Sequence, residues 1–255
     1  MGFPVYWMVT TSFKPKGDIL STNPTLLPHS FSLQNYVQAI TKDGFFKAFE
    51  NSMIVVFFTV LVSMVVATFA AIAVARMKFK GKRIYIASIL LVQMLPLAAL
   101  LIPIYLLLSK LHLVNTLAGV ILTYIALVLP FVVWTLRGFL INIPVELEEA
   151  ALIDGCTKPQ AYRLVLFPLM APGLVATSIF AFIQAWNEFL LAYILLSSHE
   201  KATMPVWLGN FTSRYGTDWG PLMAASTLTA IPVVIFFMII QDRIATGVTS
   251  GAVKG

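Results

Sequence analysis

Four side chains close together in one apolar segment have the types that could bind a polar solute within a membrane. They are Gln184, Trp186, Asn187 and Glu188, and they interrupt the apolar run 169–197. An ionisable group within a membrane span costs at least about 2.5 kcal/mol, so by default it faces protein or a water-filled cavity. The amides and the carboxylate can hydrogen-bond to hydroxyl groups, and the indole ring offers a flat apolar face. The sequence therefore predicts a solute pathway here, with one alternative: Glu188 only caps or pairs with a neighbouring helix.

Other reactive or metal-binding residues do not form a recognisable site. The single cysteine, Cys156, has no partner for an internal disulfide, and His29, His112 and His199 are too scattered to indicate a metal cage. The sequence contains neither a His-Glu-x-x-His motif nor a Gly-x-x-x-x-Gly-Lys-Ser/Thr phosphate loop. We therefore expect no catalytic residue, no metal site and no cofactor bound by this chain, and the sequence disfavours an intramembrane enzyme.

The composition indicates a membrane protein. Of the 255 residues, 59% are hydrophobic and only 11% are charged, and the mean hydropathy is +0.88. A soluble domain carries about 25% charged residues. The net charge of +6 comes from basic residues in short clusters between apolar runs. That pattern sets orientation in a bilayer and argues against nucleic-acid binding.

Five segments are long enough to cross a bilayer as helices. A crossing helix needs about 20 apolar residues, and a backbone in lipid must satisfy its own hydrogen bonds, which favours helices. The segments are 52–75, 84–108, 116–136, 169–197 and 221–241. Prolines predict kinks in several of them: Pro96, Pro103, Pro130, Pro172 and Pro232. The predicted fold is therefore all-α and polytopic.

The N-terminus offers a shorter apolar stretch, which ends before Lys14 and cannot cross a bilayer alone. We expect a partial first helix, because a signal peptide would need a basic stretch before the apolar residues and a small-residue cleavage pattern after them. The predicted organisation is this partial helix, an extracytoplasmic segment, a transmembrane domain and a cytoplasmic tail, at 1–13, 14–48, 49–243 and 244–255 respectively.

The orientation follows from the densest basic cluster, which contains Arg76, Lys78, Lys80, Lys82 and Arg83. Cytoplasmic loops carry an excess of lysine and arginine, so this loop is predicted to be cytoplasmic. Counting spans outward from it puts two segments on the same side, 137–168 and the C-terminal tail. It puts three segments outside: 14–51, 109–115 and 198–220.

The connection 137–168 predicts two short helices. Pro144 suits the first turn of the first helix, and Gly155 can adopt the left-handed conformation that ends it. Three acids favour the positive N-terminal end of that helix: Glu146, Glu148 and Glu149. Thr157, followed three residues later by a glutamine, predicts a capping box for a second helix. Pro168 is expected to mark the next boundary.

Six residues of this loop match the EAA loop of inner-membrane permeases from ATP-driven importers: Glu149, Ala150, Ala151, Asp154, Gly155 and Pro168. The family pattern is EAA, three residues, Gly, nine residues, Ile, one residue and Leu-Pro. Val165 and Phe167 replace the Ile and the Leu and keep their apolar character. The flanks resemble the maltose-permease G-type subunit of carbohydrate importers, through AWNEF at 185–189, YGTDWG at 215–220 and GAVKG at 251–255.

The resemblance implies a type I ABC importer transmembrane domain of six membrane helices, the first truncated here, in a bacterial inner membrane. It implies that the loop is a coupling helix in a cleft of a cytoplasmic ATPase, with Glu149 and Gly155 at the contact. The implied partners are a second permease subunit, two P-loop ATPase subunits that bind ATP and Mg, and an extracytoplasmic sugar-binding protein. In this family, polar positions on the helix of Glu188 line the sugar route in at least one of the two permeases.

The outer loop 198–220 carries three aromatic residues that we expect to contact the binding protein: Trp207, Tyr215 and Trp219. Anchoring at the membrane interface is the alternative role for them. A second function class is an ion-coupled secondary carrier that uses Glu188 as a proton or sodium site. The lone acid, the lack of a visible internal repeat and the EAA loop weigh against that class.

Overall fold

The structure is a computed structural model of the chain that describes residues 2–252, with side chains described to residue 239. Its α-helices are α1 (Phe3–Ser12), α2 (Lys16–Ile19), α3 (Gln34–Thr41), α4 (Phe45–Arg76), α5 (Lys82–Met94), α6 (Leu97–Lys110), α7 (Leu117–Ile141), α8 (Glu146–Ile153), α9 (Lys158–Ala161), α10 (Phe167–Asn187), α11 (Leu190–Leu195), α12 (Met204–Leu208) and α13 (Trp219–Ala252). A π-helical turn, Tyr162–Leu166, joins α9 to α10. Short 3-10 turns occur at His199–Lys201 and Gly209–Phe211, and strands β1 (Thr212–Ser213) and β2 (Gly216–Thr217) form a small hairpin.

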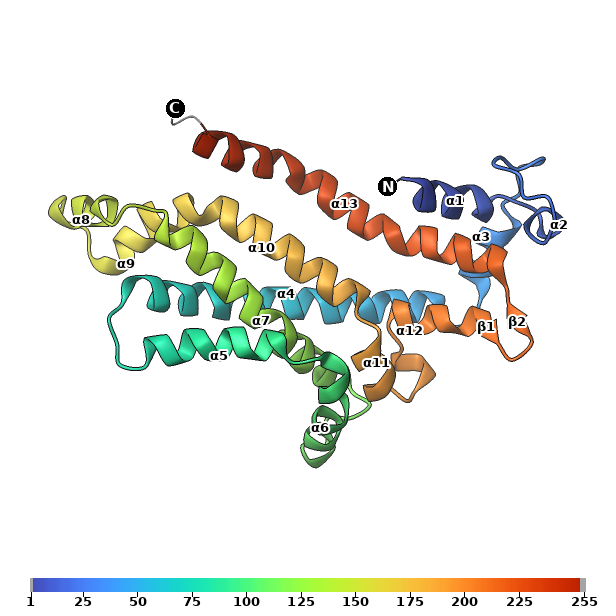
Figure 1. Cartoon of the computed structure of the whole chain (residues 1–255), viewed down its shortest axis with the longest axis horizontal. Coiled ribbons are helices and arrows are strands. Elements are labelled where there is room, and N and C mark those ends of the chain that lie inside the picture. Colours follow the sequence, from blue (N-terminus) through green and yellow to red (C-terminus); the bar gives the residue numbers. More distant parts are fainter. Residues whose placement is uncertain (1, 253–255) are drawn as a thin grey trace.

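The long helices lie side by side and give the molecule its elongated shape (Figure 1). By length and composition, 4 helices in the described part of the chain can cross a membrane: α4, α7, the continuous helix Lys158–Asn187 and α13. The pair α5 and α6 makes up to 5 if it counts as one bent span. The helix α1 packs on α13 and occupies the predicted 1–13 segment. The prediction of an all-α, multi-pass fold is confirmed.

Small residues allow α4, α7 and α10 to approach one another closely. Ala67 and Ala71 of α4 are fully buried against apolar side chains of α7. A Cβ atom on Gly173 of α10 would lie 2.7 Å from the ring of Phe139 of α7. In lipid there is little hydrophobic drive between helices, so close van der Waals contact of this kind holds them together. These three helices therefore form the rigid centre of the molecule.

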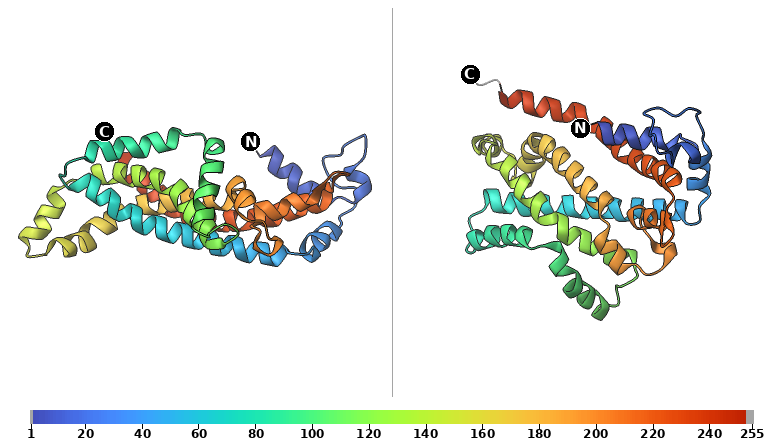
Figure 2. Two further views of the ribbon diagram at one scale, coloured as in Figure 1. Left: turned by 90° about the horizontal axis from the view of Figure 1, so that it is seen from below. Right: turned by 45° about the vertical axis from the view of Figure 1, so that its right-hand side comes forward.

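The segment 84–108 does not form the single span that the sequence predicts. It breaks between α5 and α6, and the two helices are bent by 104° from each other (Figure 2). Pro96 lacks an N–H group and restricts the residue before it, and Leu95 is extended, with φ −72° and ψ 128°. The other predicted kink positions, Pro103, Pro130, Pro172 and Pro232, lie inside continuous helices.

The boundaries predicted for 169–197 are also wrong. The helix ends at Asn187, and Glu188 is extended, with ψ 125°, before α11 starts. At the other end, Pro168 marks no boundary, because the helix continues from Lys158 through the π-helical turn. A π-turn relaxes the usual hydrogen-bond ladder, which leaves room for a proline that has no N–H to donate.

One predicted domain limit shifts, and another lies where side chains are not described. The predicted limit between 48 and 49 falls inside α4, which begins at Phe45 after Gly44, a residue with φ +83°. The predicted tail 244–255 lies beyond the described side chains; the backbone of α13 runs to Ala252, and residues 253–255 lie outside the described part.

The loops are divided between two ends of the molecule, as the predicted topology requires. The loop between α4 and α5 and the loop with α8 and α9 lie at one end, and α2 and the β1–β2 hairpin lie at the other (Figure 1). Asn115 joins two of the loops predicted to be outside. Its side chain donates to Ser198 Oγ at 2.7 Å, and its Oδ1 accepts from the N–H groups of Ser197 and Ser198.

The close contact at the start of α7 gives a stability prediction. A Cβ atom on Gly119 would lie 2.2 Å from the carbonyl oxygen of Leu113, a backbone atom that cannot rotate away. We expect Gly119→Ala to lower stability by about 1–3 kcal/mol through overpacking, seen as a lower midpoint of thermal unfolding in detergent. Gly138→Ala is the matched control in the same helix, because nothing lies within 4 Å of its added carbon. Equal midpoints for the two variants would contradict the packing described for α7.

Candidate functional site

A buried ion pair attaches the loop helix α8 to the end of α4. The Nε atom of Arg76 donates to Glu148 Oε1 at 2.6 Å, and the two side chains are only 8% and 9% exposed. The same guanidinium donates through Nη2 to the carbonyl oxygen of Ile143 at 2.9 Å. Arg76 is the last residue of α4 and Glu148 lies in the first turn of α8, so each charge also suits its helix dipole. The loop is therefore fixed to a membrane-crossing helix.

The turn after α8 has the predicted geometry. Gly155 has φ +91°, and its N–H and that of Cys156 donate to the carbonyls of Leu152 and Ala151. This left-handed position ends the helix, as expected for glycine. The capping box is confirmed too, since the backbone N–H of Thr157 donates to the side-chain oxygen of Gln160 at 2.8 Å. The loop thus holds α8 and α9 at a defined angle.

The residues of the EAA motif do not all face the same way. Glu149, Ala150, Asp154 and Gly155 are exposed, whereas Ala151 is buried against the protein and cannot help a partner to approach. Pro168 is also exposed, but it lies within α10 beyond the π-helical turn.

The exposed surface of α8 also has an apolar component, which was not predicted from the sequence. Ile153 is 86% exposed, and Leu147 and Leu152 are exposed as well. An exposed apolar patch bordered by acids, outside the membrane-crossing helices, is typical of a surface that a protein partner covers. This apolar patch could have been predicted, because the sequence places leucine and isoleucine among the acids of α8.

The four polar residues of the fifth span do not form one site. Trp186 is 1% exposed, donates from Nε1 to the carbonyl of Thr229 at 3.1 Å and stacks on Phe182. It cannot present a free face to a solute in this structure. Gln184 and Asn187 are exposed on α10.

Glu188 caps a helix, which is the predicted alternative to a role in a solute pathway. Its Oε1 accepts from the N–H of Leu191 at 2.9 Å and its Oε2 from that of Ala192 at 3.2 Å, in the first turn of α11. The hydroxyl of Tyr124 donates to the backbone carbonyl of Glu188 at 3.1 Å. The carboxylate is buried and engaged with the backbone, so it stabilises the break between α10 and α11.

Gln184 lines a cavity of about 310 Å³ that opens at the α5–α6 break. Most of the wall is apolar, and Gln93 and Thr123 contribute further polar groups. Gln93 was not predicted, although an amide in an apolar span three residues before a proline is a detectable signal. The cavity therefore combines an apolar wall with a few polar groups, as solute sites usually do.

Of the three outer-loop aromatic residues, Trp207 is a core residue. Its side chain is fully buried, its Nε1 donates to the carbonyl of Asp43 at 2.8 Å, and Phe45 and Phe211 pack edge-on against it. The prediction that Trp207 contacts a binding protein is wrong for this reason. Tyr215, at the tip of the β1–β2 hairpin, is 100% exposed, and Trp219 at the start of α13 is also exposed.

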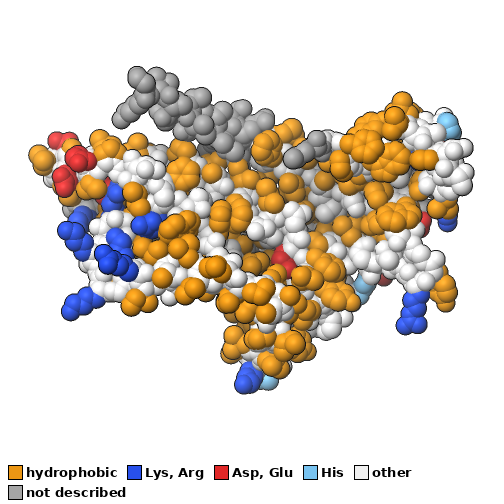
Figure 3. Space-filling view, viewed as in Figure 1, with side chains coloured by type: hydrophobic (Ala, Val, Ile, Leu, Met, Phe, Trp, Pro, Cys, Tyr) orange, Lys and Arg blue, Asp and Glu red, His pale blue; other side chains and the backbone are white. Residues whose placement is uncertain are grey.

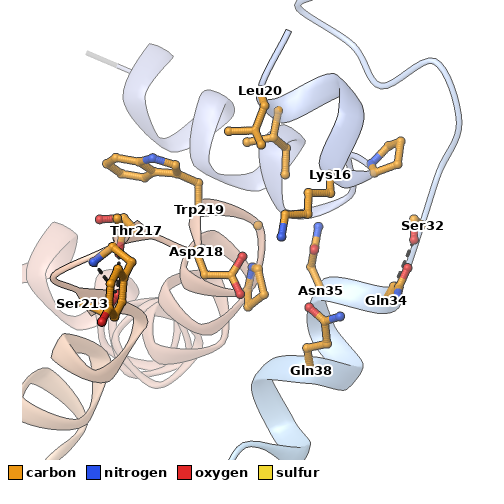
Figure 4. A pocket seen from close by; sticks show the side chains of 16 residues that line it. Lys16, Leu20, Ser32, Gln34, Asn35, Gln38, Ser213, Thr217, Asp218 and Trp219 are labelled. Carbon is orange, nitrogen blue, oxygen red and sulfur yellow. Dashed lines mark hydrogen bonds between the residues drawn. The ribbon is translucent and has the colours of Figure 1, made fainter.

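A polar pocket of about 350 Å³ lies beside the hairpin, between it and the segment that carries α2 and α3. Lys16, Asn35, Gln38 and Asp218 point toward a common space in it (Figure 4). Asn35 is held by hydrogen bonds from its amide to the carbonyls of Ser12 and Lys14. The outer surface thus offers a polar depression flanked by exposed aromatic rings.

The structure has the features of a polytopic membrane transport subunit. It has long apolar helices, a rigid loop with an exposed acidic and apolar face, and a polar pocket at the other end. The chain belongs to the family of binding-protein-dependent transport system inner membrane components, whose profile matches residues 63–250.

The curated relatives are similar over nearly their whole length. The diacetylchitobiose uptake system permease protein DasC of Streptomyces coelicolor is 45% identical over 253 residues, which are 99% of this chain and 92% of that protein. The trehalose transport system permease protein SugB of Mycobacterium tuberculosis is 39% identical over 254 residues, 99% of this chain and 92% of that protein.

Among solved structures, a bacterial ABC transporter involved in the import of the acidic polysaccharide alginate has the same fold. Its TM-score is 0.82 at 21% identity, covering 94% of this chain and 90% of that one. The protein is therefore a multi-pass permease subunit of the inner membrane and not an enzyme.

The ion pair gives a prediction about the loop. Arg76→Gln leaves the buried carboxylate of Glu148 without its partner, and breaking a buried pair costs about 3–5 kcal/mol. We expect the segment 144–157 to detach and to be cleaved much faster in limited proteolysis of membrane vesicles opened to the protease. Replacing both partners, as Arg76→Met with Glu148→Leu, should restore resistance, and Glu146→Gln on the exposed surface should not alter it. If Arg76→Gln is as resistant as the native chain, the ion pair does not hold the loop.

Proposed function

We propose that this chain forms one half of the translocation pathway of an ATP-driven, binding-protein-dependent sugar importer. It would pair with a second permease subunit and with two P-loop ATPase subunits that carry ATP and Mg, and one of these ATPase subunits would dock on its cytoplasmic loop. The names of its relatives, which take up diacetylchitobiose and trehalose, support a sugar as the solute. The observation that carries the proposal is the exposed face of α8 on a loop fixed to α4 by Arg76 and Glu148.

The exposed face of α8 suits a protein cleft. Glu149 can pair with a basic side chain of the partner, and Ile153, at the tip, can fill an apolar depression. When ATP closes the ATPase dimer, α8 would move with it. The ion pair would transmit that motion to α4, and close packing of α4 on α7 would carry it further as a rigid-body change.

The sugar pathway is proposed to pass the cavity at the α5–α6 break. Gln184 and Gln93 line it, and their amides can donate to and accept from sugar hydroxyls. The ion-coupled carrier is not supported. Glu188, its required titrating group, caps α11 instead, and the relatives are permeases of binding-protein-dependent systems.

The binding protein is proposed to dock on the outer end. Tyr215 and Trp219 flank the polar pocket there, and aromatic rings beside polar groups are typical of protein interfaces. Trp207 is buried, so the proposed contact with the binding protein involves Tyr215 and Trp219 only.

Charge reversal on α8 tests the proposed coupling. Glu149→Lys and, separately, Ile153→Asp should leave the chain inserted but reduce both ATPase co-purification and ATP-driven sugar uptake at least tenfold. Uptake is measured in proteoliposomes loaded with ATP, and co-purification by quantitative immunoblot. Glu50→Lys, an exposed charge reversal at the other end, is the control and should keep the ATPase bound. Normal uptake by both α8 variants would show that this face is not the docking surface.

Glu188→Gln separates the importer from the carrier. A neutral amide keeps one acceptor for the α11 N–H groups, and loss of a helix cap costs about 0.5–2 kcal/mol. We therefore expect a slightly lower unfolding midpoint, with ATP-driven uptake retained and its dependence on external pH unchanged. Uptake that survives ATP depletion and is lost only in the Gln variant would instead favour the carrier.

A further inference from the structure

The cytoplasmic end of the molecule has a basic groove that the proposed function does not use. Its volume is about 610 Å³, and it lies between the start of α5 and the end of α7. Four of the residues that line it are cations, Lys78, Lys82, Arg83 and Arg137, and no acid lines it. We call this surface the basic groove.

The cations of the basic groove lack acidic partners. Among the side chains that the structure describes, the neighbouring Arg76 is paired with Glu148, but no ion pair involves any of the four groove cations. The Nε atom of Arg137 is buried and has no hydrogen-bond partner among the described residues. A buried donor without an acceptor is unfavourable, so the groove is suited to an anionic ligand that accepts hydrogen bonds.

An apolar surface continues from the basic groove along α5. This helix buries none of its side chains, and Ile84 at the groove and Leu91 two turns further are 73% and 63% exposed. Lys and Arg side chains gather at this end of the molecule beside exposed hydrophobic side chains (Figure 3). A ligand that matches both surfaces has an anionic head and a long apolar tail.

We propose that the basic groove binds the phosphate headgroup of an anionic phospholipid of the inner leaflet, with its acyl chains along α5. Basic pockets at the cytoplasmic ends of membrane helices suit such headgroups. A small free anion would match the cations of the groove but would make no use of the apolar surface of α5. A phospholipid fits the position of the groove, because the groove is lined by the connection between α4 and α5 and by the last part of α7, and both α4 and α7 are long and apolar enough to cross the membrane.

Lipid retention by the purified importer complex tests the proposal. The complex is delipidated in mild detergent and titrated with phosphatidylglycerol or phosphatidylcholine, and bound lipid is counted by native mass spectrometry. We expect one phosphatidylglycerol to be retained in preference to phosphatidylcholine. The triple variant Lys82→Gln, Arg83→Gln, Arg137→Gln should lose at least tenfold in apparent affinity for it, and Arg137→Gln alone should lose several-fold.

A second triple variant controls for net charge. Lys42→Gln, Lys47→Gln, Lys110→Gln removes the same charge from the other side of the membrane and should retain the lipid as the native complex does. Three outcomes would overturn the proposal: unchanged retention in the groove variants, an equal loss in the control, or displacement of the lipid by millimolar inorganic phosphate. Because lipid binding is measured without transport, failure here leaves the proposed importer function untouched.

Discussion

The buried pair of Arg76 and Glu148 is the contact on which the account of this permease depends. It places the Nε atom of Arg76 2.6 Å from Glu148 Oε1, at the junction of a membrane-crossing helix and the loop that carries α8. Because a buried charge is stable only with its partner, the loop has one position relative to α4. In the proposed coupling, this fixed position lets the exposed face of α8 transmit motion of an ATPase to α4. Packing of α4 on α7 through Ala67 and Ala71 extends the same rigid body across the membrane.

Much of the fold could be predicted from the sequence, because apolar length and the positions of lysine and arginine report directly on the bilayer. The failures occurred where tertiary contacts decide. Pro96 breaks a span while Pro103 lies inside a helix, yet both are prolines in similar apolar surroundings. Glu188 ends α10 because its carboxylate accepts hydrogen bonds from the N–H groups of Leu191 and Ala192 in the first turn of α11. Hydropathy alone predicts neither the break at Pro96 nor the end of α10 at Glu188.

The candidate site, too, was predicted correctly where residue type decides and wrongly where tertiary contacts decide. The EAA motif identified the loop that we propose couples to an ATPase, and Gly155 predicted its turn. The motif could not show that Ala151 faces inward or that the neighbouring Glu148 is the buried acid. Trp186 and Trp207 have the residue type expected at a contact surface, and both are buried with the indole N–H paired to a carbonyl. Tryptophan is suited to either setting, so only the surrounding structure distinguishes a core residue from an exposed one such as Tyr215.

Cross-linking from the tip of α8 in native membranes would test the central claim most directly. A photo-reactive side chain placed at position 153, the most exposed apolar position of α8, labels whatever covers it, and the product is identified by mass spectrometry. The account predicts a cross-link to a polypeptide with a P-loop, at a yield that changes when ATP is added. Cross-links only to lipid or to a second copy of this chain, with no nucleotide-binding partner, would contradict it.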